Sequence, residues 1–259
     1  MSNNTVFVIG AAAGIGRAIC ELFVKNGWIV GAADIDIEGL KLLRSQLGEK
    51  QCKIFKLDVT STEEWVSALD EFHTETQSLK LLINNAGILV SGEFHATPLK
   101  TQQKVIDINV KGVMNGCHAA YPFLKNTPAA RVINLASASA IYGQPSLAAY
   151  SASKFAVKGL TEALNLEWEK DDIHVMDVLP LFVKTAMVDN MDAESIKNLG
   201  IHLSAQDVAN KIYQVANSTT STTKVHWTVG TLTWFMYLGA NLSPDWINRA
   251  INKWITRKK

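Results

Sequence analysis

The chain has 259 residues, a length within reach of one large α/β domain, and its composition excludes several classes of protein. With 47% hydrophobic and 19% charged residues it has the balance of a globular protein with a sizeable core. A formal net charge of +1 gives no overall field that would favour nucleic acid or an acidic partner.

Cysteine and histidine usage narrows the chemistry further. Cys20, Cys52 and Cys117 are scattered, and the six histidines include no H-E-x-x-H pair, so we predict neither a disulfide framework nor a metal site. The N-terminus runs directly into an apolar strand, without the basic region and cleavage site of a signal peptide. We therefore expect a cytoplasmic protein.

Apolar, strand-like runs alternate with longer stretches of helical periodicity along the whole chain. The strand-like runs cover residues 5–10, 28–34, 52–58, 79–87, 130–137, 174–180 and 224–230. Strands without polar alternation are typical of parallel sheets that helices cover on both faces. The pattern predicts a single domain over residues 1–259, an α/β fold with a doubly wound (Rossmann), mostly parallel sheet of about seven strands.

The first predicted strand leads into a glycine-rich loop, VIGAAAGIGRAI, with Gly10, Gly14 and Gly16. Glycine lets the backbone turn tightly and approach a pyrophosphate closely. The helix that follows offers free N–H groups and a partial positive charge to the phosphates. A plain glycine-rich turn between a strand and a helix is the alternative.

The second predicted strand ends at Asp34, twenty residues after Gly14. A carboxylate at this point can accept hydrogen bonds from an adenosine ribose 2′-hydroxyl and repels a 2′-phosphate. No cation stands inside the glycine loop, although Arg17 follows it directly. The pattern favours NAD, with NADP as the less favoured cofactor; a helix N-cap or a solvated loop acid is the alternative for Asp34.

Residues 148–158, AAYSASKFAVK, place Tyr150 and Lys154 one helical turn apart on the same face. A neighbouring ammonium favours phenolate over phenol, so we predict that Lys154 lowers the pKa of Tyr150. A tyrosine tuned in this way can act as a general acid or base. An amphipathic helix with one aromatic residue and one solvated lysine is the alternative for this motif alone.

Taken together, the motifs resemble those of the short-chain dehydrogenase/reductase family, in its shorter single-domain branch, up to about Val225. The matching motifs follow in family order: GAAAGIG, Asp34, LDV at Asp58, NNAG at 84–87, Asn109 in IDINVKG, Ser137 in NLASAS, YSASK at 150–154 and a partial PGxxxT in PLFVKT. Three positions depart from the family pattern: Ile9, Ala136 and Leu181, the last replacing the glycine after Pro180.

The resemblance implies an oxidoreductase that transfers a hydride between a nicotinamide cofactor and a secondary alcohol or ketone. Tyr150 would be the general acid/base, and Lys154 would tune its pKa and bond the nicotinamide ribose. Ser137 would hold the substrate oxygen, and Asn109 would hold a water of a proton relay. A catalytically silent nucleotide-binding regulator and an NAD-dependent epimerase or dehydratase are the alternatives.

The same resemblance implies a set of cofactor contacts. They are Gly10, Ala13, Gly14, Ile15 and Gly16 in the loop, Asp34, Asp58 and Val59 beside the adenosine, Asn85, Ala86 and Gly87 in the cofactor floor, Tyr150 and Lys154, and Pro180, Val183 and Thr185 near the nicotinamide. Turn formation is the alternative for Asn85, and helix capping is the alternative for Asp58.

Residues 186–205 are expected to cover the substrate. Together with Phe182 and the tryptophan-rich C-terminus they favour a hydrophobic small-molecule substrate, either steroid-like, retinoid-like or acyl-like. From the family we expect a homodimer or homotetramer.

The C-terminal part, residues 231–259, is predicted to be a helical extension. Val225 to Pro244 contains no charged residue, and we interpret it as a strand plus a short apolar helix, not as a transmembrane span. Ser243 and Pro244 are predicted as N-cap and first residue of a last helix that ends in a basic tail, Arg257 to Lys259. The apolar stripe of that helix is Trp246, Ile247, Ala250, Ile251, Trp254 and Ile255. It could face the core, cover the site, join two subunits or contact a membrane peripherally.

Overall fold

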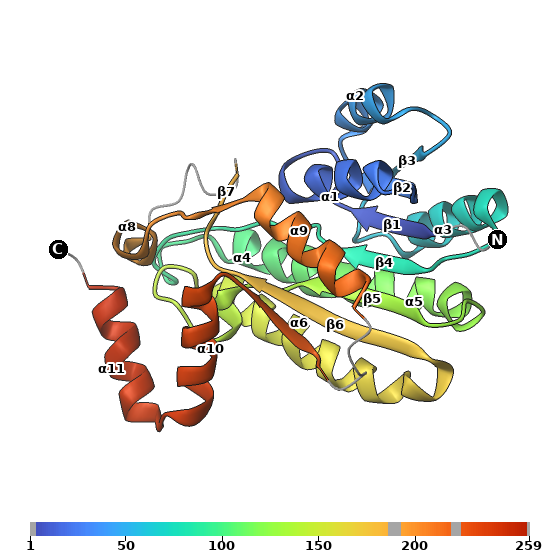
Figure 1. The fold of residues 1–259 in the computed structure, drawn as a ribbon. Helices are drawn as coiled ribbons and strands as arrows, with labels where there is room; N and C mark the ends of the chain where they lie inside the picture. The colour runs from blue at the N-terminus through green and yellow to red at the C-terminus, as the bar shows by residue number, and fades with distance from the viewer. Residues whose placement is uncertain (1–3, 186–192, 219–223, 258–259) are drawn as a thin grey trace.

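A parallel sheet of seven strands forms the centre of the computed structural model, which describes residues 4–185, 193–218 and 224–257 (Figure 1). The strand order is β3-β2-β1-β4-β5-β6-β9. The strands are β1 Thr5–Ile9, β2 Ile29–Asp34, β3 Cys52–Lys56, β4 Leu81–Asn84, β5 Ala130–Leu135, β6 Ile173–Pro180 and β9 His226–Val229. All adjacent pairs are parallel, which confirms the predicted fold class.

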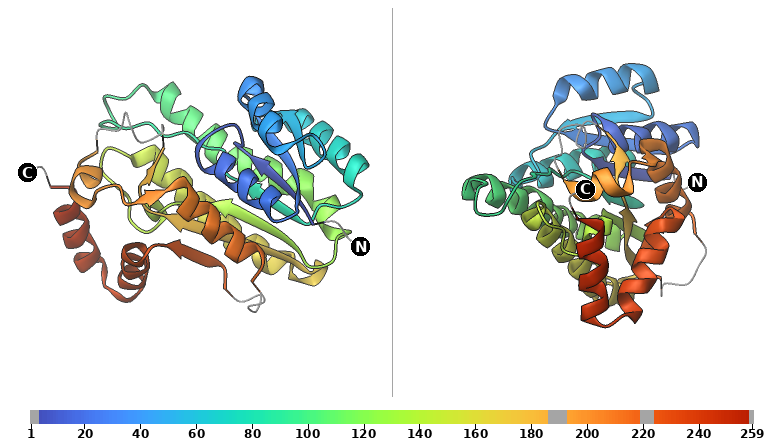
Figure 2. Two further views of the ribbon diagram at one scale, coloured as in Figure 1. Left: turned by 45° about the horizontal axis from the view of Figure 1, so that its top comes forward. Right: turned by 90° about the vertical axis from the view of Figure 1, so that its left-hand side faces the viewer.

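Helices cover both faces of this sheet because its strands alternate their side chains between two apolar cores (Figures 1 and 2). Val6 and Val8 of β1 join the core under α1, α2 and α9, while Phe7 and Ile9 join the core under α3, α5 and α6. The helices are α1 Gly14–Lys25, α2 Ile37–Leu47, α3 Thr62–Thr76, α4 Leu99–Ile106, α5 Gly112–Lys125, α6 Ala148–Glu167, α8 Glu194–Leu199, α9 Ala205–Ala216, α10 Thr231–Leu242 and α11 Asp245–Ile255.

The strand order reverses direction between β1 and β4, which are hydrogen-bonded neighbours with Ile9 opposite Asn84. In open parallel sheets, ligands bind outside the carboxyl ends of the strands at such a switch point. The glycine loop and the NNAG motif therefore meet at one place. A short second sheet, β7 Val183–Lys184 with β8 Leu203–Ser204, lies in the chain that follows β6.

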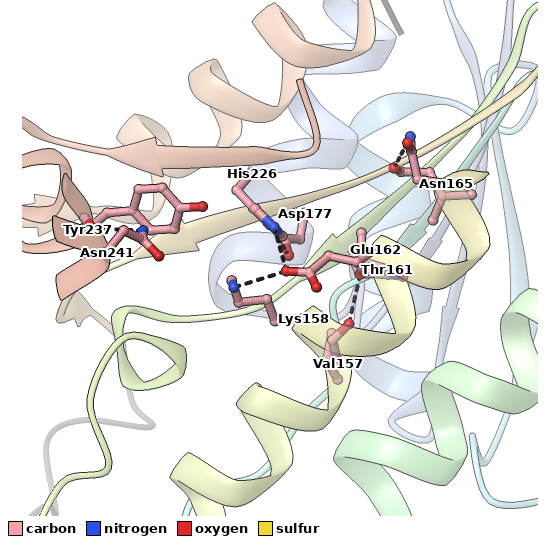
Figure 3. Close-up of polar contacts among 11 residues, drawn as sticks. Val157, Lys158, Thr161, Glu162, Asn165, Asp177, His226, Tyr237 and Asn241 are labelled. Carbon is pink, nitrogen blue, oxygen red and sulfur yellow. Dashed lines mark hydrogen bonds and ion pairs between the residues drawn. The ribbon is translucent and has the colours of Figure 1, made fainter. Parts of the chain in front are cut away.

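The last strand, β9, is anchored through a partly buried polar cluster (Figure 3). His226 Nδ1 lies 2.9 Å from both carboxylate oxygens of Asp177, and its Nε2 lies 2.8 Å from Glu162 Oε1. Lys158 pairs with the same Glu162 oxygen at 2.9 Å. Asp177 is fully buried, and burial raises the pKa of its carboxyl group while the hydrogen bond with His226 lowers it. The cluster ties β9 to both β6 and α6.

The charge-free stretch from Val225 to Pro244 forms β9 and α10, as predicted. No helix in the described parts of the chain is long and apolar enough to cross a membrane. The predicted start of the last helix was wrong by one residue. Pro244 is the N-cap, with an extended ψ of 157°, and its carbonyl accepts the first helical hydrogen bonds, so α11 begins at Asp245.

The apolar stripe predicted on α11 divides into two parts. Ile255 is buried, and Ile247 and Ile251 are partly buried, as expected for a face directed at the protein. Trp246 and Trp254 are instead 72% and 74% exposed. A helix that packs on one side only keeps residues of its opposite face in solvent.

Candidate active site

A cavity of about 1030 Å³ opens at the carboxyl ends of the central strands. Of the predicted site residues, the following line it: Gly10, Ala13, Gly14, Ile15, Asp34, Asp58, Val59, Asn85, Ala86, Gly87, Ser137, Tyr150, Lys154, Pro180, Val183 and Thr185. The other two predicted site residues, Gly16 and Asn109, do not line the cavity. The cavity is at the upper end of the usual size of small-molecule sites.

The glycine loop has the conformation and the close contacts that require glycine. Gly10 and Gly14 have φ values of +72° and +55°, in the left-handed region. A Cβ atom at Gly16 would lie 1.9 Å from the Gly10 carbonyl oxygen, and one at Gly10 would lie 2.8 Å from Asn85 Nδ2. Helix α1 starts here with Ala13 as an N-cap that makes no side-chain hydrogen bond, so its N–H groups are free for an anion.

Asp34 is held against the glycine loop. Its Oδ2 accepts a hydrogen bond from Ala12 N at 3.0 Å, and its Oδ1 accepts one from Asp36 N at 3.0 Å. The N-cap of α2 is Asp36, which accepts from Gly39 N, so Asp34 does not cap that helix. Its carboxylate lines the cavity beside the loop, as a ribose-binding acid must.

Arg17, the cation that directly follows the glycine loop in the sequence, makes its contacts with Glu21 and Gln46. Its Nε lies 3.0 Å from Glu21 Oε1, one turn further along α1. Its Nη2 donates to Gln46 Oε1 of α2 at 2.5 Å. The residues that line the described cavity include no arginine.

The loop after β3 is fixed by its own hydrogen bonds. Asp58 Oδ1 accepts from Thr60 N at 2.9 Å, and the Val59 carbonyl accepts from Trp65 Nε1 at 3.1 Å. The N-cap of α3 is Ser61, so Asp58 does not cap that helix. Asp58 and Val59 are thus held at the cavity wall where the resemblance expects the adenine.

The two asparagines of NNAG have different environments. Asn85 Nδ2 donates to the carbonyls of Ile9 and Gly10, both at 3.0 Å, and so ties the end of β4 to the glycine loop. Asn84 is buried and donates to Asn134 Oδ1 at 2.9 Å, inside the sheet. Of the two, only Asn85 lines the cavity.

Tyr150, Lys154 and Ser137 converge on one wall of the cavity. Tyr150 lies in the first turn of α6 and Lys154 in the second, with the ammonium 5.6 Å from the centroid of the phenol ring. Ser137 lies two residues after the end of β5, and its hydroxyl interacts with the Tyr150 side chain in a way that lowers the pKa of the phenol. The buried Lys154 ammonium donates to the Leu135 carbonyl at 2.7 Å.

The pKa of Tyr150 is shifted in the direction opposite to the one predicted from the sequence. Burial raises the pKa of the Tyr150 phenol, and the hydrogen bond with Ser137 opposes this only in part. Burial also lowers the pKa of Lys154 to about 8. The prediction of a lowered tyrosine pKa was therefore wrong for the protein without ligands, because it counted the attraction of the ammonium and not the desolvation of both groups.

Asn109 supports this wall from behind. It lies in a turn of π-helix, Asp107–Lys111, and its side chain exchanges two hydrogen bonds with the backbone of Ile88, at 2.8 and 2.9 Å. It also donates to Ser153 Oγ at 3.0 Å, and Ser153 donates to the Tyr150 carbonyl at 2.6 Å. Nothing in the sequence singles out Ser153, so this link was not predicted.

Apolar side chains line part of the cavity. Leu89, Leu147 and Phe182 line it together with Leu181, the residue that departs from the family pattern. Phe182 and Leu181 were singled out from the sequence. Nothing in the sequence around Leu89 and Leu147 distinguishes them from core residues, so these two were not predicted.

The predicted substrate cover, residues 186–205, is described only from residue 193. In that part, Ser195 Oγ donates to Gln144 Oε1 at 3.0 Å, in the loop between Ser137 and Tyr150. Asn198 Nδ2 donates to the Ile255 carbonyl at 2.8 Å, at the end of α11. These two links were not foreseen because no local motif marks a contact between distant segments.

Known proteins resemble the chain over most of its length. The short chain dehydrogenase family model matches residues 4–195. A 3-alpha-(or 20-beta)-hydroxysteroid dehydrogenase of Mycobacterium bovis is 32% identical over 84% of each chain. A 3alpha-hydroxysteroid dehydrogenase of Mediterraneibacter gnavus is 32% identical over 77% of this chain and 81% of its own length.

The fold is also that of a solved structure. The crystal structure of 3-ketoacyl-(acyl-carrier-protein) reductase from Brucella melitensis complexed with NADH has a TM-score of 0.80 and is 23% identical. The match covers 87% of this chain and 96% of that one. The protein belongs to the short-chain dehydrogenase/reductase family and is an NAD(P)-dependent alcohol or ketone oxidoreductase.

Proposed function

We propose that the protein transfers a hydride between NAD and a hydrophobic secondary alcohol or ketone of the hydroxysteroid class, with Tyr150 as the general acid/base. The observation that carries the proposal is the convergence of Ser137, Tyr150 and Lys154 on a cavity whose other end is a glycine cradle. Among the steroid-, retinoid- and acyl-like substrates expected from the sequence, the two hydroxysteroid dehydrogenase relatives favour the steroid class.

The residues of the cradle fit a dinucleotide. The space that a side chain at Gly10 or Gly16 would fill lets the backbone approach a pyrophosphate, and the open start of α1 supplies N–H donors. When bound, the nicotinamide ring supplies or accepts the hydride.

Two features support NAD over NADP. Asp34 presents a carboxylate in the cavity beside the glycine loop, where it would repel a 2′-phosphate. Arg17 is engaged with Glu21 and Gln46, so its charge is directed away from that position. Binding a 2′-phosphate would require Arg17 to break both contacts and Asp34 to be neutralised.

The chain's own residues supply the proton chemistry. Ser137 and Tyr150 hold the substrate oxygen between their hydroxyl groups. In reduction the Tyr150 phenol donates its proton to this oxygen, a role suited by a pKa that burial raises. In oxidation Tyr150 takes the alcohol proton, and the ammonium of Lys154 stabilises the phenolate.

Asn109 would contribute to the relay through the main chain of its π-helical turn. Its side-chain oxygen and nitrogen are committed to Ile88 and Ser153. A water beside Lys154 would therefore bond to a backbone atom of the turn.

The sequence also leads us to propose a homodimer or homotetramer and a cytoplasmic location. Sedimentation would test the oligomeric state, and cell fractionation would test the location.

The test is a set of initial rates with a 3α-hydroxysteroid and either NAD or NADP. We expect turnover with NAD, and a loss of about 10²-fold or more in Tyr150→Phe, because general acid/base catalysis contributes about 10²- to 10⁴-fold. Asp34→Ala should lower the ratio of the rate with NAD to the rate with NADP. Tyr213→Phe, which changes a tyrosine packed against Phe23 outside the cavity, is the matched control and should keep full activity.

Each result separates a different part of the proposal. Full activity of Tyr150→Phe would contradict the role of the phenol, and a preference of the wild type for NADP would contradict the role of Asp34. Turnover of another apolar alcohol, with none of the steroid, would refute only the substrate class. Binding of NADH without turnover of any alcohol or ketone would favour the silent regulator.

A further inference from the structure

The hairpin of α10 and α11 carries an exposed apolar surface outside the cavity. It stands beyond the edge of the sheet as a separate pair of helices (Figures 1 and 2). Large apolar side chains 41–76% exposed make up this hairpin surface: Leu232, Trp234, Phe235, Leu238 and Leu242 of α10, and Trp246 and Trp254 of α11.

Helix α10 has an unusual composition for a helix with so much exposed surface. Its sequence, TLTWFMYLGANL, contains no charged residue, and Thr233 is its one buried residue. A helix that is apolar around most of its circumference is normally buried in a core or in a membrane. The outer face of α10 therefore needs a second surface to cover it.

The outer face of α11 adds positive charge to this surface. Trp246, Arg249, Ala250, Lys253 and Trp254 follow the spacing i, i+3, i+4, i+7, i+8 and are all exposed. Arg249 and Lys253 form no ion pair with any residue that the structure describes. Two tryptophans thus flank two cations, neither of which pairs with an acid in the described parts of the chain, on one helix face.

We propose that the hairpin surface binds to the interface of a lipid bilayer that contains anionic lipid. Tryptophan is suited to the headgroup region, where one part of its ring is apolar and its N–H is hydrated. Exposed lysine and arginine beside it are attracted to the negative surface potential of such a membrane. Neither helix spans the bilayer, so α10 and α11 lie on it.

A second copy of the chain fits this surface less well. A symmetric dimer places the same patch of both subunits in one interface. Arg249 and Lys253 of one copy would then approach those of the other, and the two Asp245 carboxylates of such a dimer could not neutralise its four cations. An anionic bilayer complements the charge and the apolar residues together.

The hairpin is held rigidly enough to act as a preformed binding surface. Asn252 Nδ2 donates to the Gly143 carbonyl at 2.7 Å, and Asn198 of α8 donates to the Ile255 carbonyl at 2.8 Å. At the other end, His226 ties β9 to the body of the protein. Binding therefore needs no refolding, and it brings the membrane next to α8 and to the loop that contains Gly143.

The test is flotation of the full-length protein with vesicles of phosphatidylcholine alone or with 30% phosphatidylserine. We expect binding to the anionic vesicles that weakens as NaCl is raised. Arg249→Glu with Lys253→Glu should lower the partition coefficient at least about 25-fold, because each cation near an anionic surface contributes about fivefold. Trp246→Ala with Trp254→Ala should lower it at least about tenfold, because the indole rings lose their contact with the interface.

Matched variants outside the hairpin control for charge and for apolar area. Lys25→Glu with Lys50→Glu changes two exposed lysines at the end of α1 and after α2, and Leu166→Ala removes a leucine of α6 that is 73% exposed. Both should bind vesicles like the wild type. All variants should keep the far-ultraviolet circular dichroism and the affinity for NADH.

Three results would overturn the proposal. The first is absence of binding to anionic vesicles at low salt. The second is binding that the hairpin variants and the control variants weaken equally. The third is a dimer in sedimentation experiments that the tryptophan variant dissociates while no vesicle binding occurs, which would assign the hairpin surface to a second copy.

Discussion

Replacing Lys154 by methionine should make the protein more stable while it removes activity. The ammonium is buried, and burial lowers its pKa from 10.5 to about 8. At pH 7 the folded protein therefore holds a charge that its environment disfavours. Methionine has a similar length and carries no charge, so its side chain can occupy the same space without this cost.

The size of the effect follows from the two pKa values. Each tenfold change in proton affinity corresponds to about 1.36 kcal/mol, so the charged lysine destabilises the folded state by about 3 kcal/mol at pH 7. The variant loses the hydrogen bond from Nζ to the Leu135 carbonyl, which opposes the gain by about 1–2 kcal/mol. The expected net gain is about 1–2 kcal/mol.

The pH dependence of the free energy of unfolding tests independently whether the Lys154 charge destabilises the folded protein. Between pH 8 and 10.5 the folded state has released the Lys154 proton and the unfolded state still holds it. The unfolded state binds more protons there, so the wild type gains stability as the pH rises. The cost of the charge falls from about 3 kcal/mol at pH 7 to about 1 kcal/mol at pH 9.5, and the advantage of Lys154→Met should shrink by about 2 kcal/mol.

Urea unfolding of both proteins at pH 7 and pH 9.5 measures this difference, and other titrating groups cancel in the comparison. A variant that is less stable than the wild type at pH 7 would refute the reasoning. So would a stability difference that stays constant between the two pH values.

Two further predictions concern the β9 anchor and the glycine cradle. His226→Ala should cost about 3–5 kcal/mol in the free energy of unfolding, because it leaves a buried carboxylate without its partner. Adding Asp177→Asn should recover most of this loss, since burial already disfavours the ionised form; equal stability of the single and double variants would contradict it. Gly16→Ala should weaken NADH binding at least about tenfold, because overpacking of about 1–3 kcal/mol against the Gly10 carbonyl displaces the loop. Gly159→Ala, whose Cβ meets no atom within 4 Å, should bind NADH like the wild type in the same fluorescence titration.

The sequence predicts the strands well because a parallel sheet covered on both faces leaves uninterrupted apolar runs. The glycine cradle is equally visible, since the close approach of Gly16 to the Gly10 carbonyl excludes every other residue type. In both cases a local requirement determines the local sequence. The same holds for Tyr150 and Lys154, whose spacing sets their common helix face.

Features that depend on contacts between distant segments could not be predicted. The orientation of Arg17 depends on Gln46 in another helix, and the pKa of Tyr150 depends on how completely the surrounding chain buries it. The link from Asn198 to the end of α11 joins segments more than fifty residues apart. Helical spacing gave the apolar stripe of α11 but not which part of it the rest of the protein covers.

The most direct test of the proposed activity is to follow the hydride itself. The purified protein would be incubated with a 3-ketosteroid and NADH that carries deuterium at both C4 positions of the nicotinamide, and the alcohol product analysed by mass spectrometry. Transfer to the carbonyl carbon predicts one deuterium at the carbinol carbon of the product, and Tyr150→Phe should form at least about a hundredfold less of this deuterated alcohol in the same time. A wild-type product without deuterium at this carbon would contradict hydride transfer from the cofactor, and with it the proposed function.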